Sequence, residues 1–371
     1  MKKKKILLVG GTRPNFMKVS PVYEALKKHR RFQPVLVHTG QHYDAEMSKV
    51  FFDDLKLPKP DIHLGVGSGT HAVQTGKIME RFEKVCIKDV PDLVIVVGDV
   101  NSTIACALVA AKICIPVAHV EAGLRSFDRT MPEEINRLLT DQISDYLFTT
   151  CPDADKNLLR EGISRKKLFF VGNTMIDSLK RHLTAARATR SWQKLGLDNT
   201  NYGVMTLHRP SNVDNIAVLQ RVMGAVSQVS QNLPIVFPVH PRTAKQYGNI
   251  HKHVFDSVQK KGILMVEPLG YLEFLGLMQN ASLVLTDSGG IQEESTILGI
   301  PCLTLRNNTE RPITIKQGTN ILVGNDPEQI IKGAMRQLKK GKRRKRIPKY
   351  WDGKAAVRIA KILHSTFEHK R

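Results

Sequence analysis

The segment Leu283-Val-Leu-Thr-Asp-Ser-Gly-Gly-Ile-Gln-Glu-Glu294 decides how this chain folds. Residues 283–286 form a short apolar run that predicts a buried strand, and Ser288-Gly289-Gly290 predicts a tight turn before a helix. A strand that enters a helix through a glycine-rich turn is typical of open parallel α/β sheets. The backbone N–H groups of such a turn, together with the helix N-terminus, favour binding of a diphosphate. A glycine-rich turn without a ligand is the alternative interpretation.

The same alternation of short apolar runs and helix-length segments extends outward through the whole chain. The predicted strands are 5–9, 34–38, 93–97, 117–120, 147–149, 169–171, 203–207, 235–239, 263–266, 283–286 and 302–305. The predicted helices between them are 18–29, 72–88, 102–112, 132–144, 215–230 and 272–279. The alternation indicates an α/β protein of two Rossmann-like, doubly wound parallel-sheet domains that face a cleft.

The length of 371 residues also favours two domains, because it exceeds what one hydrophobic core usually supports. We place an N-terminal domain at 1–173 and a C-terminal domain at 174–354. The polar, helix-like segment 174–198 is expected to connect them, and a C-terminal helix within 355–371 is expected to pack back on the first domain.

Composition excludes several classes of protein. Hydrophobic residues make up 42% of the chain, but no apolar run approaches the length of a membrane span. The basic start of the chain leads into an apolar run too short for a signal peptide, so we expect a cytoplasmic protein. The five cysteines form no C-x-x-C pair, which predicts reduced thiols and neither a zinc site nor disulfides.

The net charge of +22 has two interpretations. The basic run 342–346 is of a kind that binds nucleic acid. No nucleic-acid fold signature accompanies it, however, so we favour a solvated segment in a protein that handles anionic substrates.

Three carboxylates are the candidate acid–base groups. Asp99 and Glu121 each follow a predicted strand, and Glu133 opens a predicted helix. At one sheet edge their charges would repel and raise at least one pKa, which suits proton transfer. Arg125 is a candidate partner that would keep Glu121 ionised. An aspartate that caps a helix, or a glutamate that offsets a helix dipole, is the plainer interpretation.

Basic residues follow other strands of the predicted sheets. Arg13 and Lys18 lie beyond the Gly10-Gly11 turn and are suited to a phosphate or a carboxylate, although the turn lacks the G-x-G-x-x-G dinucleotide pattern. His208 and His240 follow two strands of the second half, where structural histidines are the alternative.

Eight segments of the chain, in this order, resemble the non-hydrolysing UDP-N-acetylglucosamine 2-epimerases, a family with the GT-B type of two-domain fold. They are Gly-Thr-Arg-Pro at 11–14, Thr-Gly-Gln-His at 39–42, Gly-Asp at 98–99, His-Val-Glu-Ala-Gly-Leu-Arg at 119–125, Pro-Glu-Glu-Ile-Asn-Arg at 132–137, His-Arg at 208–209, Asp-Ser-Gly-Gly-Ile-Gln-Glu-Glu at 287–294 and Thr-Glu-Arg-Pro at 309–312. The resemblance covers nearly the whole chain.

This resemblance implies a reaction and roles for the residues that match. UDP is eliminated with loss of the proton at carbon 2, and it adds back to a bound 2-acetamidoglucal after protonation from the other face. The implied catalytic residues are Asp99, Glu121, Glu133 and His208. The implied UDP contacts are Arg13, Lys18, Arg137, Ser288, Gly289, Gly290, Glu294 and Arg311. Neither a metal nor NAD is required, the partner is a UDP-sugar, and a homodimer is expected.

The chain departs from the family pattern at two places. Asn15 stands where the family often has glutamate, and Tyr43 stands where the family more commonly has arginine after Gln-His. The preceding pair, Gln41-His42, matches the segment near which bacterial members bind an activating UDP-N-acetylglucosamine. Gln41, His42 and His240 are the candidate allosteric residues. A hydrolysing 2-epimerase, an epimerase of a UDP-linked diacetamido uronic acid, a glycosyltransferase and a nucleic-acid-binding protein are the alternatives.

Overall fold

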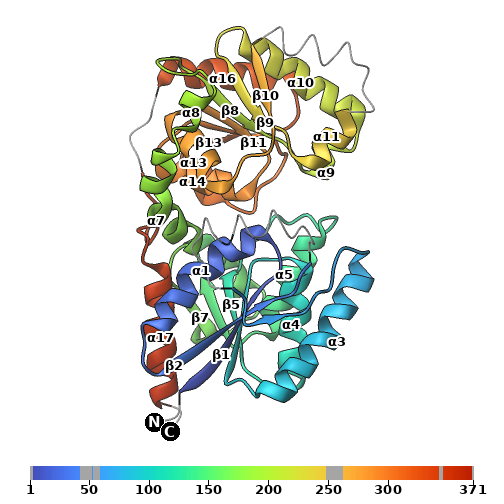
Figure 1. The fold of residues 1–371 in the computed structure, drawn as a ribbon, viewed down its shortest axis with the longest axis vertical. Coiled ribbons are helices and arrows are strands. Elements are labelled where there is room, and N and C mark those ends of the chain that lie inside the picture. Colours follow the sequence, from blue (N-terminus) through green and yellow to red (C-terminus); the bar gives the residue numbers. More distant parts are fainter. Residues whose placement is uncertain (1–2, 42–51, 53–58, 248–261, 342–345, 370–371) are drawn as a thin grey trace. The chain divides into compact units, whose positions relative to one another are not determined.

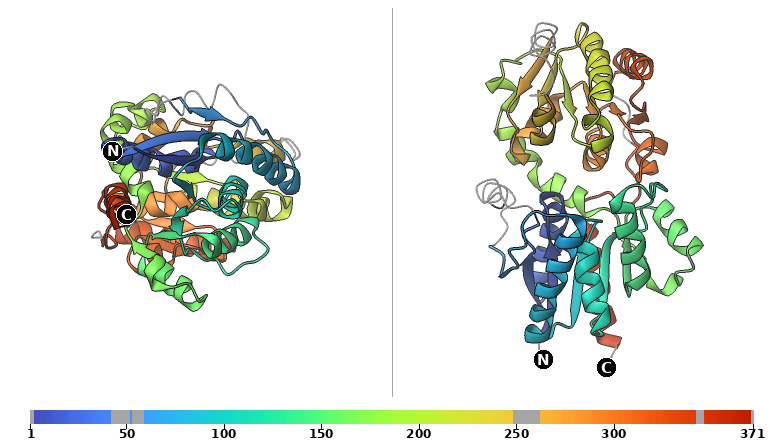
Figure 2. Two further views of the ribbon diagram at one scale, coloured as in Figure 1. Left: turned by 90° about the horizontal axis from the view of Figure 1, so that it is seen from below. Right: turned by 90° about the vertical axis from the view of Figure 1, so that its right-hand side faces the viewer.

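The computed structural model describes residues 3–41, 52, 59–247, 262–341 and 346–369. The chain divides into two compact units. Unit 1 comprises Met1–Arg181 and Lys349–Arg371, and unit 2 comprises His182–Pro348. Each unit contains one parallel sheet between helices, which confirms the predicted α/β class (Figures 1 and 2).

Unit 1 contains a seven-stranded parallel sheet in the order β3-β2-β1-β4-β5-β6-β7. Its strands are β1 (Lys4–Gly10), β2 (Phe32–His38), β3 (Ile62–His63), β4 (Leu93–Val97), β5 (Val117–Ala122), β6 (Tyr146–Thr149) and β7 (Leu168–Phe170). Its helices are α1 (Arg13–Lys27), α3 (His71–Asp89), α4 (Asn101–Lys112), α5 (Pro132–Ile143), α6 (Pro152–Arg160), the first part of α7 (Thr174–Ala188) and α17 (Ala355–His369).

The core of unit 1 follows from the alternation of side chains along the strands. Leu7 and Val9 of β1 point to the face that α3 and α4 cover, where they join Phe82 and Cys86. Because successive side chains in a strand point to opposite faces, Ile6 and Leu8 point to the other face and are also fully buried. Strands buried on both faces explain why the sequence shows continuous apolar runs.

Unit 2 repeats this arrangement with six strands in the order β10-β9-β8-β11-β12-β13. Its strands are β8 (Gly203–Thr206), β9 (Ile235–Pro238), β10 (Ile263–Val266), β11 (Leu283–Thr286), β12 (Cys302–Thr304) and β13 (Asn320–Leu322). Its helices include the end of α7 and α8 (Ser191–Lys194), α9 (Pro210–Val213), α10 (Ile216–Ser230), α11 (Pro241–Tyr247), α13 (Tyr271–Asn280), α14 (Gly289–Leu298), α15 (Pro312–Lys316) and α16 (Pro327–Lys340). One apolar cluster lies against α10 and α16, and a second lies against α8 and α13.

The units divide at 181/182 and 348/349, whereas the sequence analysis placed the boundaries at 173/174 and 354/355. The first half of α7 belongs to unit 1 because Asp177 accepts hydrogen bonds from the backbone of Ala355 and Ala356 at the start of α17. The buried Trp351 donates from Nε1 to the carbonyl of Thr150, 2.9 Å away, so the segment before α17 also belongs to unit 1. Helix α17 then packs against α1 (Figure 1).

Two short strands, β3 and β13, were not predicted, because two or three residues carry no periodic signal. Helix α1 begins at Arg13 and not at 18, with Pro14 in its first turn, where a proline is well tolerated. Of the helices that the structure describes, none combines the length and the apolar character that crossing a membrane requires.

The strand order places a possible ligand site in each sheet. The chain runs outward from β1 through β2 to β3 and then crosses back to β4 on the other side of β1, and the same reversal separates β8 from β11. Ligands of open α/β sheets bind at the carboxyl ends of strands beside such a switch point. In unit 1 the candidate residues follow β1 and β4 or lie in the last part of β5, and in unit 2 they follow β8 and β11.

Candidate functional site

Glu121 is the next-to-last residue of β5 in unit 1 and is held in an uncommon conformation. Its φ of 73° lies in the left-handed region, which residues other than glycine rarely adopt. Its side chain is buried, with Oε2 2.5 Å from Nζ of Lys18, a buried residue of α1. A costly backbone conformation persists only where the surroundings enforce it, and such residues cluster at functional sites.

Asp99 follows β4 and is paired with Arg137 of α5. Nη2 of Arg137 lies 2.5 Å from Oδ2 of Asp99, while its Nη1 lies 2.6 Å from Oε2 of Glu134. The side chain of Asn136 donates to the backbone carbonyl of Asp99 at 2.9 Å. Asp99 and Glu121 are thus each paired with a cation, which offsets the mutual repulsion expected from the sequence.

The predicted partnership between Arg125 and Glu121 is wrong. Arg125 donates to both carboxylate oxygens of Glu161 and lies 2.8 Å from Oδ2 of Asp141. Lys18, more than a hundred positions away in the sequence, provides the charge against Glu121. Lys18 was predicted as a UDP contact, and the structure places it beside a catalytic candidate.

The two glutamates at the start of α5 differ in their surroundings. Glu134 is buried and accepts hydrogen bonds from the backbone N–H groups of Ser126 and Phe127. Glu133, the catalytic candidate, is only partly buried. The hydrogen bonds of Glu134 give it a structural task at the start of α5.

The remaining candidates of unit 1 lie near the end of β1 and β2. Gln41 is buried, and its Oε1 accepts from the hydroxyl of Ser102 at 2.7 Å. Asn15, the departure from the family pattern, accepts from the backbone of Gly11 and donates to the carbonyl of Val97. His42 lies outside the described residues, as does the side chain of Arg13.

In unit 2, His208 follows β8 and is oriented by Asp287, which follows β11. Nδ1 of His208 lies 2.9 Å from Oδ1 of Asp287. Asp287 is fully buried and also accepts from the backbone N–H groups of His208 and Arg209. Burial alone would raise the pKa of Asp287, but the contacts with His208 and these N–H groups outweigh it and lower the pKa. His240 is exposed, with its ring centroid 5.5 Å from that of His208.

The glycine-rich turn begins α14 as predicted. Ser288 is the N-cap, and its side chain makes no capping hydrogen bond in the described structure, so the first-turn N–H groups remain suited to an anion. Gly289 has a second role, because a Cβ there would lie 2.3 Å from Nη1 of Arg311. Gly290 is partly exposed beside it.

Arg311 is engaged by carboxylates of unit 2 itself. Its Nε lies 2.8 Å from Oε1 of Glu293, and its Nη1 contacts Glu310. Glu310 also lies 2.9 Å from Nη1 of Arg306. This buried network sets the position of Arg311, which was predicted as a UDP contact.

Glu294 lies in α14, where only 4% of the residue is exposed. Burial raises the pKa of Glu294 to about 7, the hydrogen bond from the hydroxyl of Tyr271 lowers it, and the charge of Glu293 raises it. The Tyr271 oxygen lies 3.0 Å from Oε1 of Glu294. Tyr271 was not predicted as a site residue, because it begins a helix that carries no motif.

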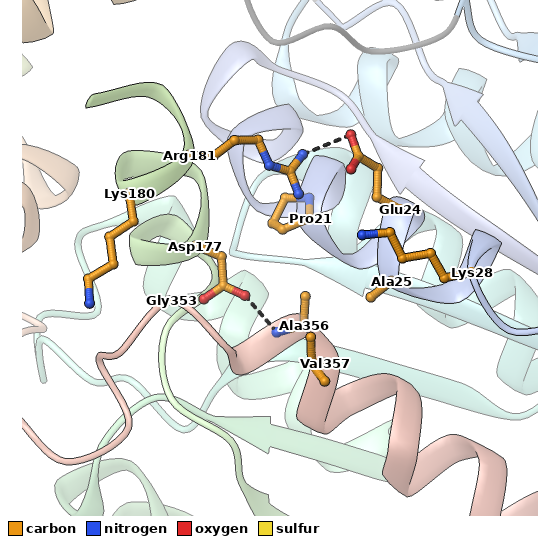
Figure 3. Close-up of a pocket in the computed structure, with 10 residues that line it drawn as sticks. All are labelled: Pro21, Glu24, Ala25, Lys28, Asp177, Lys180, Arg181, Gly353, Ala356 and Val357. Atoms are coloured by element: carbon orange, nitrogen blue, oxygen red, sulfur yellow. Dashed lines mark hydrogen bonds and ion pairs between the residues drawn. The ribbon is translucent and has the colours of Figure 1, made fainter. Parts of the chain in front are cut away.

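A separate cavity of about 310 Å³ lies in unit 1, away from these motifs (Figure 3). It is lined by α1, α7 and the segment around the start of α17, and includes Asp177 and the ion pair between Arg181 and Glu24 at 2.8 Å. None of the predicted site residues lines it. Within the described part of the chain, no group of three His, Cys, Asp or Glu side chains is arranged to hold a metal ion.

Comparison with known proteins gives consistent matches over nearly the full chain. Residues 24–364 match the family model described as UDP-N-acetylglucosamine 2-epimerase. A protein of that name from Methanocaldococcus jannaschii is 47% identical over 365 residues, which cover 97% of this chain and 98% of that protein. The UDP-2,3-diacetamido-2,3-dideoxy-D-glucuronate 2-epimerase of Pseudomonas aeruginosa is 42% identical over 369 residues, which cover 97% and 99% of the two chains.

A solved structure agrees with these matches. The UDP-GlcNAc 2-epimerase of Methanocaldococcus jannaschii, in complex with UDP-GlcNAc and UDP, superposes with a TM-score of 0.89 at 46% identity. The alignment covers 97% of this chain and 99% of that one.

Proposed function

The chain belongs to the UDP-N-acetylglucosamine 2-epimerase family and is therefore an isomerase, and we propose that it interconverts UDP-GlcNAc and UDP-ManNAc without hydrolysis. The observation that carries this proposal is the pairing of Asp99 with Arg137 and of Glu121 with Lys18 beside the switch point of the unit 1 sheet. A carboxylate at this edge is suited to accepting the proton from carbon 2 or to stabilising positive charge, and the paired cation fixes where it lies.

The reaction begins with loss of UDP from carbon 1 and of the proton from carbon 2. The C1–O bond breaks with its electrons going to UDP, and the C2–H electrons form the C1–C2 double bond of 2-acetamidoglucal. Return of a proton to the opposite face of carbon 2, and of UDP to carbon 1, completes the epimerisation. Atoms and electrons balance without an oxidant.

The exposure of the carboxylates suggests how the roles divide. A group that exchanges its proton with solvent must reach water, and the side chain of Asp99 is 25% exposed whereas that of Glu121 is 3% exposed. We assign proton transfer to Asp99 and the partly buried Glu133, and charge stabilisation near carbon 1 to Glu121. A positioned acid or base contributes about 10²–10⁴-fold to the rate.

The residues of unit 2 are assigned to the UDP portion. The N-terminus of α14 at Ser288, Gly289 and Gly290 would hold the diphosphate, and His208 would meet the charge that builds on the leaving group. Glu294 would accept hydrogen bonds from the ribose hydroxyls. Arg13 and Arg311 are assigned supporting contacts to UDP, and Gln41, His42 and His240 remain candidates for an activating site.

Product analysis in deuterium oxide tests the reaction. We expect NMR to show UDP-ManNAc formed from UDP-GlcNAc, with deuterium at carbon 2. Free N-acetylmannosamine as the main product would indicate a hydrolysing enzyme, and product without deuterium would contradict the elimination. The relative from Pseudomonas aeruginosa makes a UDP-diacetamido uronic acid the second candidate substrate, and parallel turnover of both sugars decides between them.

The roles themselves are tested with variants that keep shape and remove charge. Asp99→Asn, Glu121→Gln and Glu133→Gln are expected to lower turnover about 10²–10⁴-fold while calorimetric UDP binding persists. A carboxylate variant that loses UDP binding but keeps turnover at saturating substrate would contradict its assignment.

We also propose a cytoplasmic homodimer that supplies a UDP-sugar for cell-surface polysaccharide. Four of the five cysteines are buried as free thiols, which suits a reducing compartment. The exposed apolar side chains of Val73 on α3 and Leu139 on α5, two helices that both pack against α4, are suited to a subunit interface. Light scattering on the purified protein and fractionation of cells test these two points.

A further inference from the structure

His119 of β5 lies between the two strand ends that carry Asp99 and Glu121. It is fully buried, with Nδ1 2.6 Å from Oδ1 of Asp141 and Nε2 2.7 Å from the carbonyl oxygen of Gly98. A carbonyl oxygen can only accept, so the imidazole donates from Nε2 to Gly98 while its Nδ1 contacts the carboxylate of Asp141.

Asp141 of α5 connects this histidine to the second strand end. Its Oδ2 accepts from the backbone N–H of Gly123 at 3.0 Å and lies 2.8 Å from Nη1 of Arg125. Burial alone would raise the pKa of Asp141, but the charges of His119 and Arg125 outweigh burial and hold it below its usual range. One buried carboxylate thus contacts the backbone of one strand end directly and that of the other through His119.

Both strand ends have left-handed backbone at the contacted residues, Gly98 and Gly123, and Glu121 nearby shares it. Gly98, Glu121 and Gly123 have φ values of 66°, 73° and 79°. Gly98 immediately precedes Asp99, and Gly123 follows Glu121 by two residues. A left-handed conformation costs roughly 1–3 kcal/mol at a residue such as glutamate, so the surrounding bonds must enforce it.

Stability alone does not account for this buried group of charges. Replacement of a buried ionic group by apolar residues of similar volume is often neutral or stabilising. We propose that His119 and Asp141 are positioning residues, which fix the ends of β4 and β5 so that Asp99 and Glu121 keep the geometry that proton transfer requires. This inference rests on the proposed epimerisation.

Two substitutions of His119 separate the two hydrogen bonds. The amide nitrogen of asparagine lies close to the position of Nδ1 and that of glutamine close to the position of Nε2, so only His119→Gln keeps a donor toward Gly98. Because a displacement of about 1 Å can cost on the order of 10²-fold, we expect His119→Asn to lower kcat by about 10–100-fold. KM and calorimetric UDP affinity should stay near the wild-type values, and His119→Gln should retain much more of kcat.

The controls distinguish positioning from a general effect on folding. Asp145 accepts from the backbone N–H of Val117 at 2.9 Å, at the opposite end of β5, so Asp145→Asn should leave kcat unchanged. Asp141→Asn keeps an acceptor oxygen but removes the charge, and it should lower kcat as His119→Asn does. Asp141→Asn replaces His119→Asn as the test variant if the latter does not fold. Each rate is expressed per folded molecule, and each variant must show a cooperative thermal unfolding transition.

Two results would overturn the inference. One is equal loss of kcat in His119→Asn and His119→Gln. The other is wild-type kcat in Asp141→Asn, or in His119→Asn, despite a lowered melting temperature. A wild-type enzyme that turns over no UDP-sugar would refute the proposed function and this inference together, whereas an active wild type with fully active variants refutes the inference alone.

Discussion

Lowering the pH from 8 to 6 should weaken UDP binding by about tenfold through the single carboxyl group of Glu294. This side chain is buried in α14, and its Oε1 accepts from the hydroxyl of Tyr271 at 3.0 Å. Burial raises the pKa of Glu294 to about 7, the contact with Tyr271 lowers it, and the charge of Glu293 raises it. If ribose hydroxyls donate to the ionised carboxylate, protonation removes an acceptor that the bound nucleoside needs.

The magnitude follows from the position of this pKa. With a pKa of about 7, the carboxyl group is roughly nine-tenths ionised at pH 8 and roughly one-tenth ionised at pH 6. If only the ionised form binds well, the apparent affinity follows the ionised fraction. Because the ionised carboxylate of Glu294 is the binding form, UDP affinity is highest above the pKa and decreases as the pH falls through the pKa.

Calorimetric titration of UDP at pH 6, 7 and 8 provides the assay. The ratio of dissociation constants between the wild type and Glu294→Gln cancels the titration of the UDP phosphate and should rise about tenfold from pH 8 to pH 6. Tyr271→Phe removes the donor that lowers the pKa, so the midpoint should move to higher pH. A ratio that does not change with pH, or a midpoint that moves down in Tyr271→Phe, would refute the reasoning.

Three further predictions concern stability and the basic run. Burial raises the pKa of Asp177 to about 6 from 3.8, so its contribution to stability is fully present below pH 3.8 and is lost as the pH rises through 6. Urea denaturation should therefore show the wild type losing about 2.4 kcal/mol relative to Asp177→Asn between pH 4 and 7, and parallel curves would contradict this. Gly172→Ala should destabilise the protein by at least about 1–3 kcal/mol, because a Cβ at φ 94° would lie 2.0 Å from the carbonyl oxygen of Tyr350. Gly162→Ala, at φ 82° with no atom within 4 Å, is the matched control, and equal thermal shifts in the two would show that the clash is relieved. Replacement of the basic residues of 342–346 by serine should leave turnover within about twofold of wild type, since the run lies outside every site motif; a large loss with intact folding would assign the run to substrate or to an interface.

The sequence predicted the candidate site wherever an apolar run ended in a polar residue. Asp99, Glu121 and His208 were placed at strand ends because buried parallel strands leave continuous apolar runs, and the structure has them there. The short strands β3 and β13 escaped this argument, because a run of two or three residues cannot be distinguished from a loop.

The partners of these residues could not be predicted, since pairing depends on how distant segments come together. Arg125 is four positions from Glu121, but Lys18 of α1 is the residue that contacts it. Glu134 and Asp141 share one face of α5 with Arg137, a charged stripe that helical periodicity would assign to solvent. The stripe is buried because it packs on polar strand ends and not on an apolar sheet face.

A common arrangement connects three candidate groups of the two units: Glu121, Asp99 and His208 are each held by a second group from their own unit. Lys18 holds Glu121, and Arg137 holds Asp99, both within unit 1. Asp287 orients His208 within unit 2. Loss of one member of a buried charge pair commonly costs about 3–5 kcal/mol, because the other charge is left unpaired. Variants that remove a holding residue should therefore damage their own unit, and UDP binding by unit 2 should survive changes to the carboxylates of unit 1. This independence is the reason that turnover and UDP affinity, measured side by side, can assign each residue to proton transfer or to nucleotide binding.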